Sequence, residues 1–208
     1  MNETKYRYRA VFAKNCDMRF IGHLDLQQLL ERALRRSGLP LRYSQGFSPK
    51  VRLNLASALP LGFTSSAEMM DFWLEQPMEP SLIQQQLNSA LPTGIRILSV
   101  TEVSNDFPSL QASLKAAEYK VSFKAGVDVS AVCANLEELL NEPNLIVTRR
   151  NKQFDLKPLV EALQWEEDKL YLRLSNRPEA SARPDELLAL LGLAPEQYDI
   201  QRIGLYYS

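Results

Sequence analysis

The sequence is poor in the residues that build metal centres and disulfide frameworks. It contains one histidine and two cysteines, and Cys16 and Cys133 lie far apart in the chain. Two such cysteines form no disulfide framework, no CxxC motif and no iron–sulfur cluster motif. One histidine with two cysteines is also too few ligands for a conventional zinc site. We therefore expect a protein without a metal and without a cofactor.

Long apolar runs and a strong net charge are also missing. No run of about 18 apolar residues is present, and the first residues lack the pattern of a signal peptide. We therefore expect a soluble, cytoplasmic protein that does not bind a membrane. The formal net charge is −1, so any affinity for nucleic acid must come from local basic patches. With 45% hydrophobic and 24% charged residues, the composition is that of a globular protein.

The periodicity of apolar residues predicts an α+β protein made of two tandem ferredoxin-like (βαββαβ) halves with antiparallel sheets. The first half is expected to span residues 1–104. Its strands are predicted near residues 6–12, 51–55, 69–74 and 95–100, and its helices near residues 26–34 and 80–91. Pro80 suits the first turn of the second helix.

A polar stretch at residues 104–113 is predicted to be a linker, and the same order of elements is expected again in residues 114–208. One segment of this second half, residues 154–165, fits either a helix or one arm of a hairpin. We favour the hairpin, because Pro158 would interrupt a helix and the next strand begins at once.

Residues 19–55 carry the strongest functional signal. An amphipathic helix is predicted to bury Leu26, Leu30 and Leu34 and to expose arginines near its C-terminal end. A loop with Gly46 and Pro49 follows, and then an alternating strand. Basic side chains beside aromatic rings are typical of nucleic-acid surfaces, where guanidinium groups contact phosphates and rings stack on bases. The predicted nucleic-acid-binding residues are Arg19, His23, Arg32, Arg35, Arg36, Arg42, Tyr43, Gln45, Phe47, Lys50 and Arg52.

The same stretch also has an interpretation without a binding role. The arginines can form a solvated helix face, with Glu31 and Arg35 as an i, i+4 ion pair. The basic group of Arg149, Arg150 and Lys152 in the second half is adequately explained as the tip of a hairpin.

The single histidine also has two interpretations. His23 precedes an acidic first turn and can act as a general acid–base or contact a phosphate, with Tyr43 and Lys50 as supporting candidates. Alternatively, it is a capping or packing histidine. Asp71 and Asp155 have no second acid at a suitable spacing, and the sequence contains no P-loop, dinucleotide fingerprint or nucleophile elbow. Catalysis is therefore an open question.

The run from Arg19 through "HLDL", "ERALRR", "YSQGFSP" and "ALPLG" resembles a bacterial family described as radical-SAM-linked or radical-SAM-associated proteins, a domain of unknown function. The resemblance rests on residues 19–20, 23–26, 31–36, 39–40, 43–47, 49 and 58–62, with a weaker match at residues 155–158. Gly22 stands where relatives often have serine, and Ser48 where they often have histidine. The resemblance implies a companion of a radical S-adenosylmethionine enzyme.

Three functions follow as hypotheses. The first is a non-catalytic accessory protein that presents RNA (tRNA or rRNA) to a radical-SAM enzyme through the basic helix and the loop. The second is a protein-interaction domain that docks on that enzyme without RNA. The third is a metal-independent endoribonuclease that uses His23, by fold-level analogy with RNA-processing nucleases of CRISPR systems.

Overall fold

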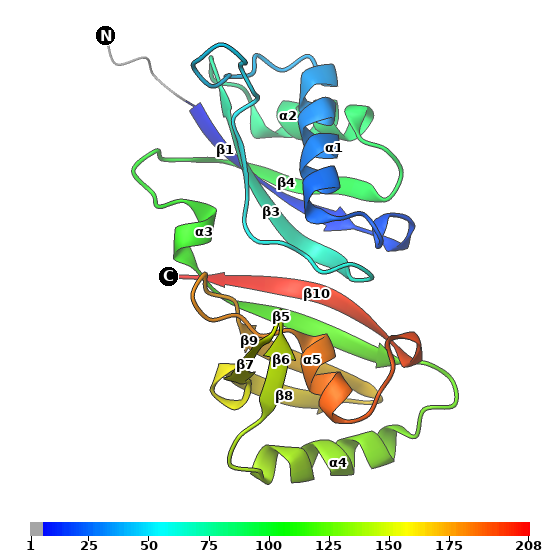
Figure 1. The fold of residues 1–208 in the computed structure, drawn as a ribbon. Coiled ribbons are helices and arrows are strands. Elements are labelled where there is room, and N and C mark those ends of the chain that lie inside the picture. The colour runs from blue at the N-terminus through cyan, green and yellow to red at the C-terminus, as the bar shows by residue number, and fades with distance from the viewer. Residues whose placement is uncertain (1–5) are drawn as a thin grey trace. The chain divides into compact units, whose positions relative to one another are not determined.

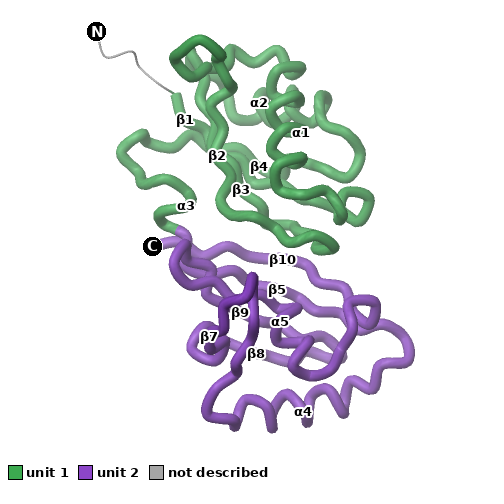
Figure 2. The backbone as a smooth tube through the Cα atoms, in the orientation of Figure 1, with its two compact units in different colours: residues 1–113 green, residues 114–208 purple. Residues whose placement is uncertain are grey.

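The computed structural model describes residues 6–208. These residues form two compact units, with the boundary between Ser113 and Leu114 (Figures 1 and 2). Both units are mixed α+β with antiparallel strand pairing, and the α+β class expected from the sequence is confirmed. No helix in residues 6–208 has the length and apolar character needed to cross a membrane.

Unit 1 is built from four strands and two main helices. The strands are β1 (Tyr6–Lys14), β2 (Leu53–Leu55), β3 (Thr64–Leu74) and β4 (Ile95–Val103). The helices are α1 (His23–Arg36), α2 (Pro80–Ala90) and the short α3 (Leu110–Ser113), with a 3₁₀ turn at Cys16–Met18. The strands pair antiparallel in the order β4-β1-β3-β2.

The core of unit 1 lies between this sheet and the two helices (Figure 1). Alternate residues of β1 point into it, and Tyr8, Ala10 and Phe12 are fully buried. The apolar stripe of α1, including Leu30 and Leu34, packs into the same cluster. Pro80 occupies the first turn of α2, as predicted. The helical and alternating patterns of the sequence are therefore explained by one shared core.

Two details of unit 1 differ from the sequence expectation. The strand expected at residues 51–55 is shorter, because Val51 forms only an isolated bridge to Tyr43. The stretch at residues 104–113 contains α3, and its Leu110 is buried.

Unit 2 has a four-stranded sheet and a separate hairpin. The sheet strands are β5 (Leu114–Phe123), β8 (Val160–Glu166), β9 (Lys169–Ser175) and β10 (Tyr198–Tyr207), in the order β10-β5-β9-β8. The hairpin strands are β6 (Ile146–Arg149) and β7 (Lys152–Asp155). The helices are α4 (Val129–Asn141) and α5 (Pro184–Leu190), with 3₁₀ turns at Lys157–Leu159 and Pro195–Gln197.

The ambiguous segment of unit 2 forms a hairpin arm, as we expected. Pro158 lies in the 3₁₀ turn, and β8 then pairs antiparallel with β9 across a turn at Glu167. The basic group in this unit is also a hairpin tip, because Arg150 and Asn151 turn the chain with positive φ between β6 and β7. Arg149 itself is held by a bidentate ion pair with Glu186, at 2.6 Å.

Candidate nucleic-acid interface

Positive charge is concentrated in one segment of unit 1. From Arg32 to Ala67 the sequence contains six arginines and lysines and no aspartate or glutamate, although the whole chain has a net charge of −1. In the structure this segment runs from the second half of α1 through a loop and β2 into β3. Such a local excess of positive charge attracts anionic ligands even when the net charge of the protein is near zero.

The first part of this segment lies on a rigid element. Helix α1 buries its apolar stripe, and Arg32, Arg35 and Arg36 are exposed in its second half. Cations near a helix C-terminus are favoured by the helix dipole. The helix ends at Arg36 with Ser37 as its C-cap, and Gly38 follows with φ +73°, a conformation typical of the residue after a helix cap. The arginines therefore have a fixed backbone position.

The loop after α1 is closed at its base and exposed at its tip. The backbone N–H of Ser44 donates to the Lys50 carbonyl at 2.8 Å, and the Lys50 N–H donates to Ser44 Oγ at 3.0 Å. Gly46 has φ +125° at the turn. Next to it the Phe47 ring is fully exposed, with a relative exposure of 111%. An aromatic ring in this position does not pack in the protein core and is accessible to a ligand.

Two arginines lie over aromatic rings at this surface. The guanidinium carbon of Arg35 is 5.6 Å from the centroid of the Tyr43 ring, and that of Arg52 is 4.3 Å from the Trp73 ring. Such contacts restrain a guanidinium group and leave its edge free for phosphate oxygens. We name the exposed set the basic–aromatic surface. It consists of Arg32, Arg35, Arg36, Tyr43, Gln45, Phe47, Lys50 and Arg52.

One predicted member, Arg42, does not belong to this surface. Its side chain is buried and lies 3.6 Å from the carboxylate of Glu75. Its backbone N–H donates to the Trp73 carbonyl, and its own carbonyl accepts from the Arg52 N–H. Arg42 therefore ties the start of the loop to the end of β3, and its charge is not presented to a ligand.

Arg19 and His23 lie at the opposite end of α1. His23 is the first residue of this 14-residue helix, which is about 20 Å long at about 1.5 Å per residue. Tyr43 contacts the last turn of the same helix through Arg35. The structure therefore does not bring His23 together with Tyr43 and Lys50. The buried Nδ1 of His23 also has no hydrogen-bond partner among residues 6–208, and a general base is normally oriented by such a partner. The geometry gives the nuclease hypothesis no support.

The segment that leads into α1 is held by a buried cation. Lys14 is fully buried, and its ammonium group donates to the carbonyls of Arg19, Ile21 and Phe63 at 3.2–3.4 Å. A buried ammonium group needs such partners, because they replace the hydrogen bonds that it made to water in the unfolded chain. Lys14 thereby fixes the start of α1 against the turn before β3.

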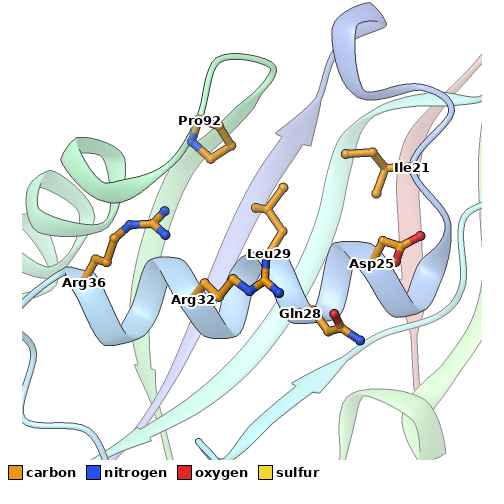
Figure 3. A pocket seen from close by; sticks show the side chains of 7 residues that line it. All are labelled: Ile21, Asp25, Gln28, Leu29, Arg32, Arg36 and Pro92. Atoms are coloured by element: carbon orange, nitrogen blue, oxygen red, sulfur yellow. The ribbon is translucent and has the colours of Figure 1, made fainter.

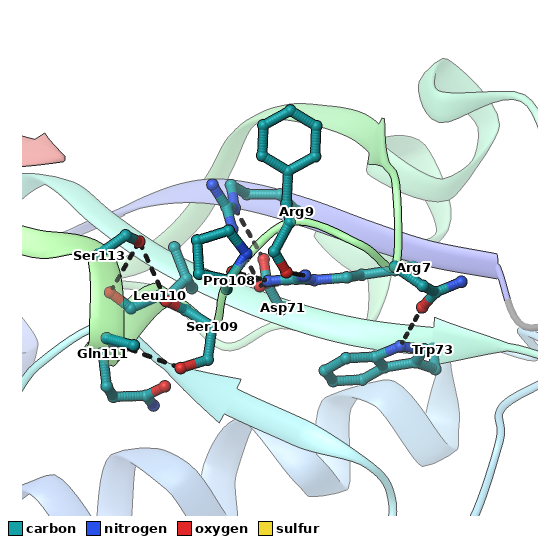
Figure 4. Close-up of polar contacts among 12 residues, drawn as sticks. Arg7, Arg9, Asp71, Trp73, Pro108, Ser109, Leu110, Gln111 and Ser113 are labelled. Carbon is teal, nitrogen blue, oxygen red and sulfur yellow. Dashed lines mark hydrogen bonds and ion pairs between the residues drawn. The ribbon is translucent and has the colours of Figure 1, made fainter. Parts of the chain in front are cut away.

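A second buried charge cluster lies on the sheet. Asp71 of β3 accepts hydrogen bonds from Arg7 and from Arg9 of β1, at 2.5–3.1 Å (Figure 4). Arg7 also donates to the carbonyls of Phe107 and Pro108, which attaches the segment before α3 to the sheet. The alternation in β1 indicates that Arg7 and Arg9 share a face, but their common partner is more than 60 residues away. Sequence patterns alone do not identify such a partner.

The two carboxylates considered for chemistry both have structural roles. Asp71 neutralises the two arginines, and Asp155 accepts from the backbone N–H groups of Leu145 and Lys157 at 2.8 and 3.0 Å. Within residues 6–208, no three His, Cys, Asp or Glu side chains are grouped so that they can hold a metal ion. The basic–aromatic surface is the part of unit 1 where most of the predicted site residues are exposed together.

Comparison with known proteins gives a family. No curated protein matches the chain. Among solved structures, a protein of unknown function from Galdieria sulphuraria is similar, with 14% identity and a TM-score of 0.30 over 96% of this chain and 99% of that chain. A bacterial family described as "Uncharacterized protein conserved in bacteria (DUF2344)" matches residues 7–184. This match spans most of both units, and the chain therefore belongs to that family.

Proposed function

We propose that this protein is a non-catalytic module that binds RNA through the basic–aromatic surface. One observation carries the proposal: a segment with six cations, five of them exposed, and no carboxylate also holds a fully exposed aromatic ring, Phe47. Phosphate contacts provide affinity, and a ring beside them provides a platform for a base. This combination distinguishes the surface from an ordinary solvated helix face, which carries mixed charges.

Single-stranded RNA suits this surface better than a duplex. An exposed ring stacks on a base only when that base is unpaired, as in a loop, a bulge or an end. The arginines on α1 are exposed and can contact phosphates, and the exposed Phe47 lies on the neighbouring loop. The loops of tRNA or rRNA therefore form the substrate class that we propose.

A charge-reversal variant tests the proposal. We expect the double substitution Arg35→Glu and Arg36→Glu to weaken binding of a fluorescently labelled single-stranded RNA at least tenfold at low salt, measured by anisotropy. The slope of log K against log salt should also become shallower by about one for each lost phosphate contact. Thermal unfolding of the free variant checks that the fold is intact, since Arg36 also bonds the Ala90 carbonyl.

The matched control places the same charge change on unit 2. Lys115 and Arg177 are both exposed, and Lys115→Glu with Arg177→Glu should leave RNA affinity nearly unchanged. If the two double variants weaken binding equally, the attraction is a general charge effect and the proposed surface is wrong. If the wild-type protein binds no RNA at low salt, the function itself is wrong.

A second candidate function is docking on a radical-SAM enzyme. The family description names no such partner, so this candidate rests on the sequence resemblance and on one surface feature. Phe20, Leu24 and Leu61 are 62–72% exposed near the start of α1, away from the arginine-rich end. Cross-linking in cells followed by mass spectrometry tests it. A radical-SAM enzyme should be recovered with the wild type and lost with Phe20→Ser and Leu24→Ser; its absence in both samples removes the candidate.

We also propose that each unit is a ferredoxin-like domain, with the β6–β7 hairpin inserted into the second. The support is the element order together with the matching strand orders, β4-β1-β3-β2 and β10-β5-β9-β8. Cross-strand amide contacts measured by NMR test this proposal. Contacts between Arg9 and Asp71, and between Tyr119 and Leu172, should be present, and a different pairing would falsify it.

A further inference from the structure

A cavity of about 290 Å³ lies beside α1, on the side that faces the turn after α2 (Figure 3). Its apolar wall is formed by Ile21, Leu29 and Pro92. The volume is at the lower end of the range of ligand sites, which is about 300–1,000 Å³. An apolar wall of this kind suits a flat ring such as a base. Of its lining residues, only Arg32 and Arg36 belong to the basic–aromatic surface.

Three of the four polar side chains around the cavity have no protein partner among residues 6–208. Asp25, Gln28 and Arg32 also line it, and none of the three has a hydrogen bond or an ion pair within residues 6–208. Arg36 lines the same cavity and uses only one bond, from its guanidinium group to the Ala90 carbonyl at 2.8 Å. A carboxylate, an amide and two guanidinium groups are thus available to a ligand.

These polar groups follow one another along the axis of α1. Asp25 lies in the first turn of α1, near Ile21, and Arg36 lies at the other end (Figure 3). Asp25 and Arg32 are seven residues, or about 10 Å, apart along the axis. This is the scale of one nucleotide, from the edge of the base to the phosphate. Spacings of three, four and seven residues place all four polar groups on one side of the helix.

We propose that this cavity binds a guanine nucleotide. The base lies against Leu29 and Pro92, its N1–H and N2–H groups donate to the Asp25 carboxylate, and its phosphate contacts Arg32 and Arg36. Guanine alone among the four bases presents two adjacent N–H donors on its Watson–Crick edge. Adenine and cytosine place a ring nitrogen acceptor beside their amino group, and uracil flanks its single N–H with two carbonyls. A carboxylate therefore selects guanine.

This proposal deepens the proposed function, on which it rests, because the cavity shares Arg32 and Arg36 with the basic–aromatic surface. A strand of RNA that crosses α1 would place one base in the cavity and another base of the same strand near Phe47. The predicted specificity is then for an unpaired guanosine. A free guanine nucleotide offers the same chemistry, so the experiment must separate the two sources.

The test compares the full chain with two cavity variants and one control. By calorimetry, 5′-GMP should bind about tenfold more tightly than 5′-AMP, 5′-CMP or 5′-UMP. Asp25→Asn should abolish this preference, because an amide no longer accepts both donors. Arg32→Gln should weaken all four nucleotides to a similar extent, since it contacts only the phosphate. Asp168→Asn, an exposed carboxylate in the β8–β9 turn, should change nothing.

The same proteins are then tested with the labelled RNAs UUUGUUU and UUUAUUU. A guanosine preference that Asp25→Asn removes supports the cavity as part of the RNA site. RNA binding with no preference, together with equal binding of GMP and AMP, overturns the cavity proposal and leaves the proposed function standing. Selective binding of GMP without binding of either RNA keeps the cavity as a site for free nucleotides and overturns the RNA function.

Discussion

The guanidinium carbon of Arg35 lies 5.6 Å from the centroid of the Tyr43 ring, and this contact joins the last turn of α1 to the base of the loop that follows. The base of the loop is closed by two hydrogen bonds between Ser44 and Lys50. A rigid helix and a loop closed at its base therefore form one continuous surface. Only the loop tip, with Phe47, extends beyond it.

The exposed position of Phe47 gives the first prediction. Phe47→Ala should weaken binding of single-stranded RNA by about 1–3 kcal/mol, the range measured for stacking of a base on an aromatic ring. It should leave the free energy of unfolding nearly unchanged, because the ring packs against nothing. Anisotropy and urea unfolding measure the two quantities. Phe107→Ala, another exposed ring of unit 1, is the control and should not affect binding.

Substitutions of Arg42 and Arg52 should have opposite effects, although the two residues are only ten positions apart. Arg52→Ala should lower RNA affinity and have little effect on stability, because its guanidinium group is exposed over Trp73. Arg42→Ala should lower stability, by roughly 1–3 kcal/mol for a lost buried polar contact, and have little direct effect on affinity. Equal effects of the two variants on RNA binding would show that the Arg42 charge also contributes.

This pair also shows what the sequence can and cannot predict. The helix, the loop and their exposed arginines follow from local signals: a helical apolar stripe, Gly38 after the helix, and the Gly46–Pro49 punctuation. The burial of Arg42 depends on Glu75, which is contributed by a later part of the chain. Local patterns assign a residue to an element, but they do not identify the partner that tertiary packing brings to it.

The same reason explains the other differences. Lys14 continues the inward-facing alternation of Phe12, but the three carbonyls that hold its ammonium group come from residues outside β1. His23, Tyr43 and Lys50 are close in sequence, yet the length of α1 separates the first from the other two. The cavity beside Pro92 was not expected either, since it depends on how the turn after α2 lies against α1.

The buried cluster on the sheet predicts a large effect on stability. The Asp71 side chain is 1% exposed and the Arg7 side chain 4%, so Asp71→Asn leaves a buried cation without its counter-charge. We expect the free energy of unfolding of unit 1 to fall by about 3–5 kcal/mol. In a Trp165→Phe background, Trp73 is the only tryptophan and reports urea unfolding of this unit.

The control for this prediction is the exposed Asp106. Asp106→Asn removes the same charge from a site with only a bond to Ser104, and its effect should stay within about 0.5 kcal/mol of the wild type. A similar, small effect of both variants would mean that water solvates Arg7 when Asp71 is neutral. The cluster would then contribute little to the stability of the sheet.

The last prediction concerns pH and lies in unit 2. The Tyr206 hydroxyl donates to Glu118 at 2.6 Å and accepts from Arg173 at 2.8 Å. The hydrogen bond to the Glu118 carboxylate raises the pKa of Tyr206 above its ordinary value of 10.0, and partial burial and the charge of Glu118 act in the same direction. Because the phenol ionises more easily in the unfolded chain, Tyr206 stabilises the fold fully below about pH 10. This contribution is lost as the pH rises through the raised pKa.

Tyr206→Phe should therefore have a lower free energy of unfolding than the wild type at about pH 8. The difference between the two proteins should be smaller at about pH 11. Urea unfolding followed by circular dichroism measures both differences, and other tyrosines and lysines that titrate in this range are common to the two proteins. Glu118→Gln supplies an independent readout, because without the carboxylate the tyrosinate absorbance attributable to Tyr206 should appear at lower pH. If the difference in free energy of unfolding is the same at both pH values, Tyr206 ionises equally easily in the folded and unfolded chains. The hydrogen bond to Glu118 would then not stabilise the neutral phenol.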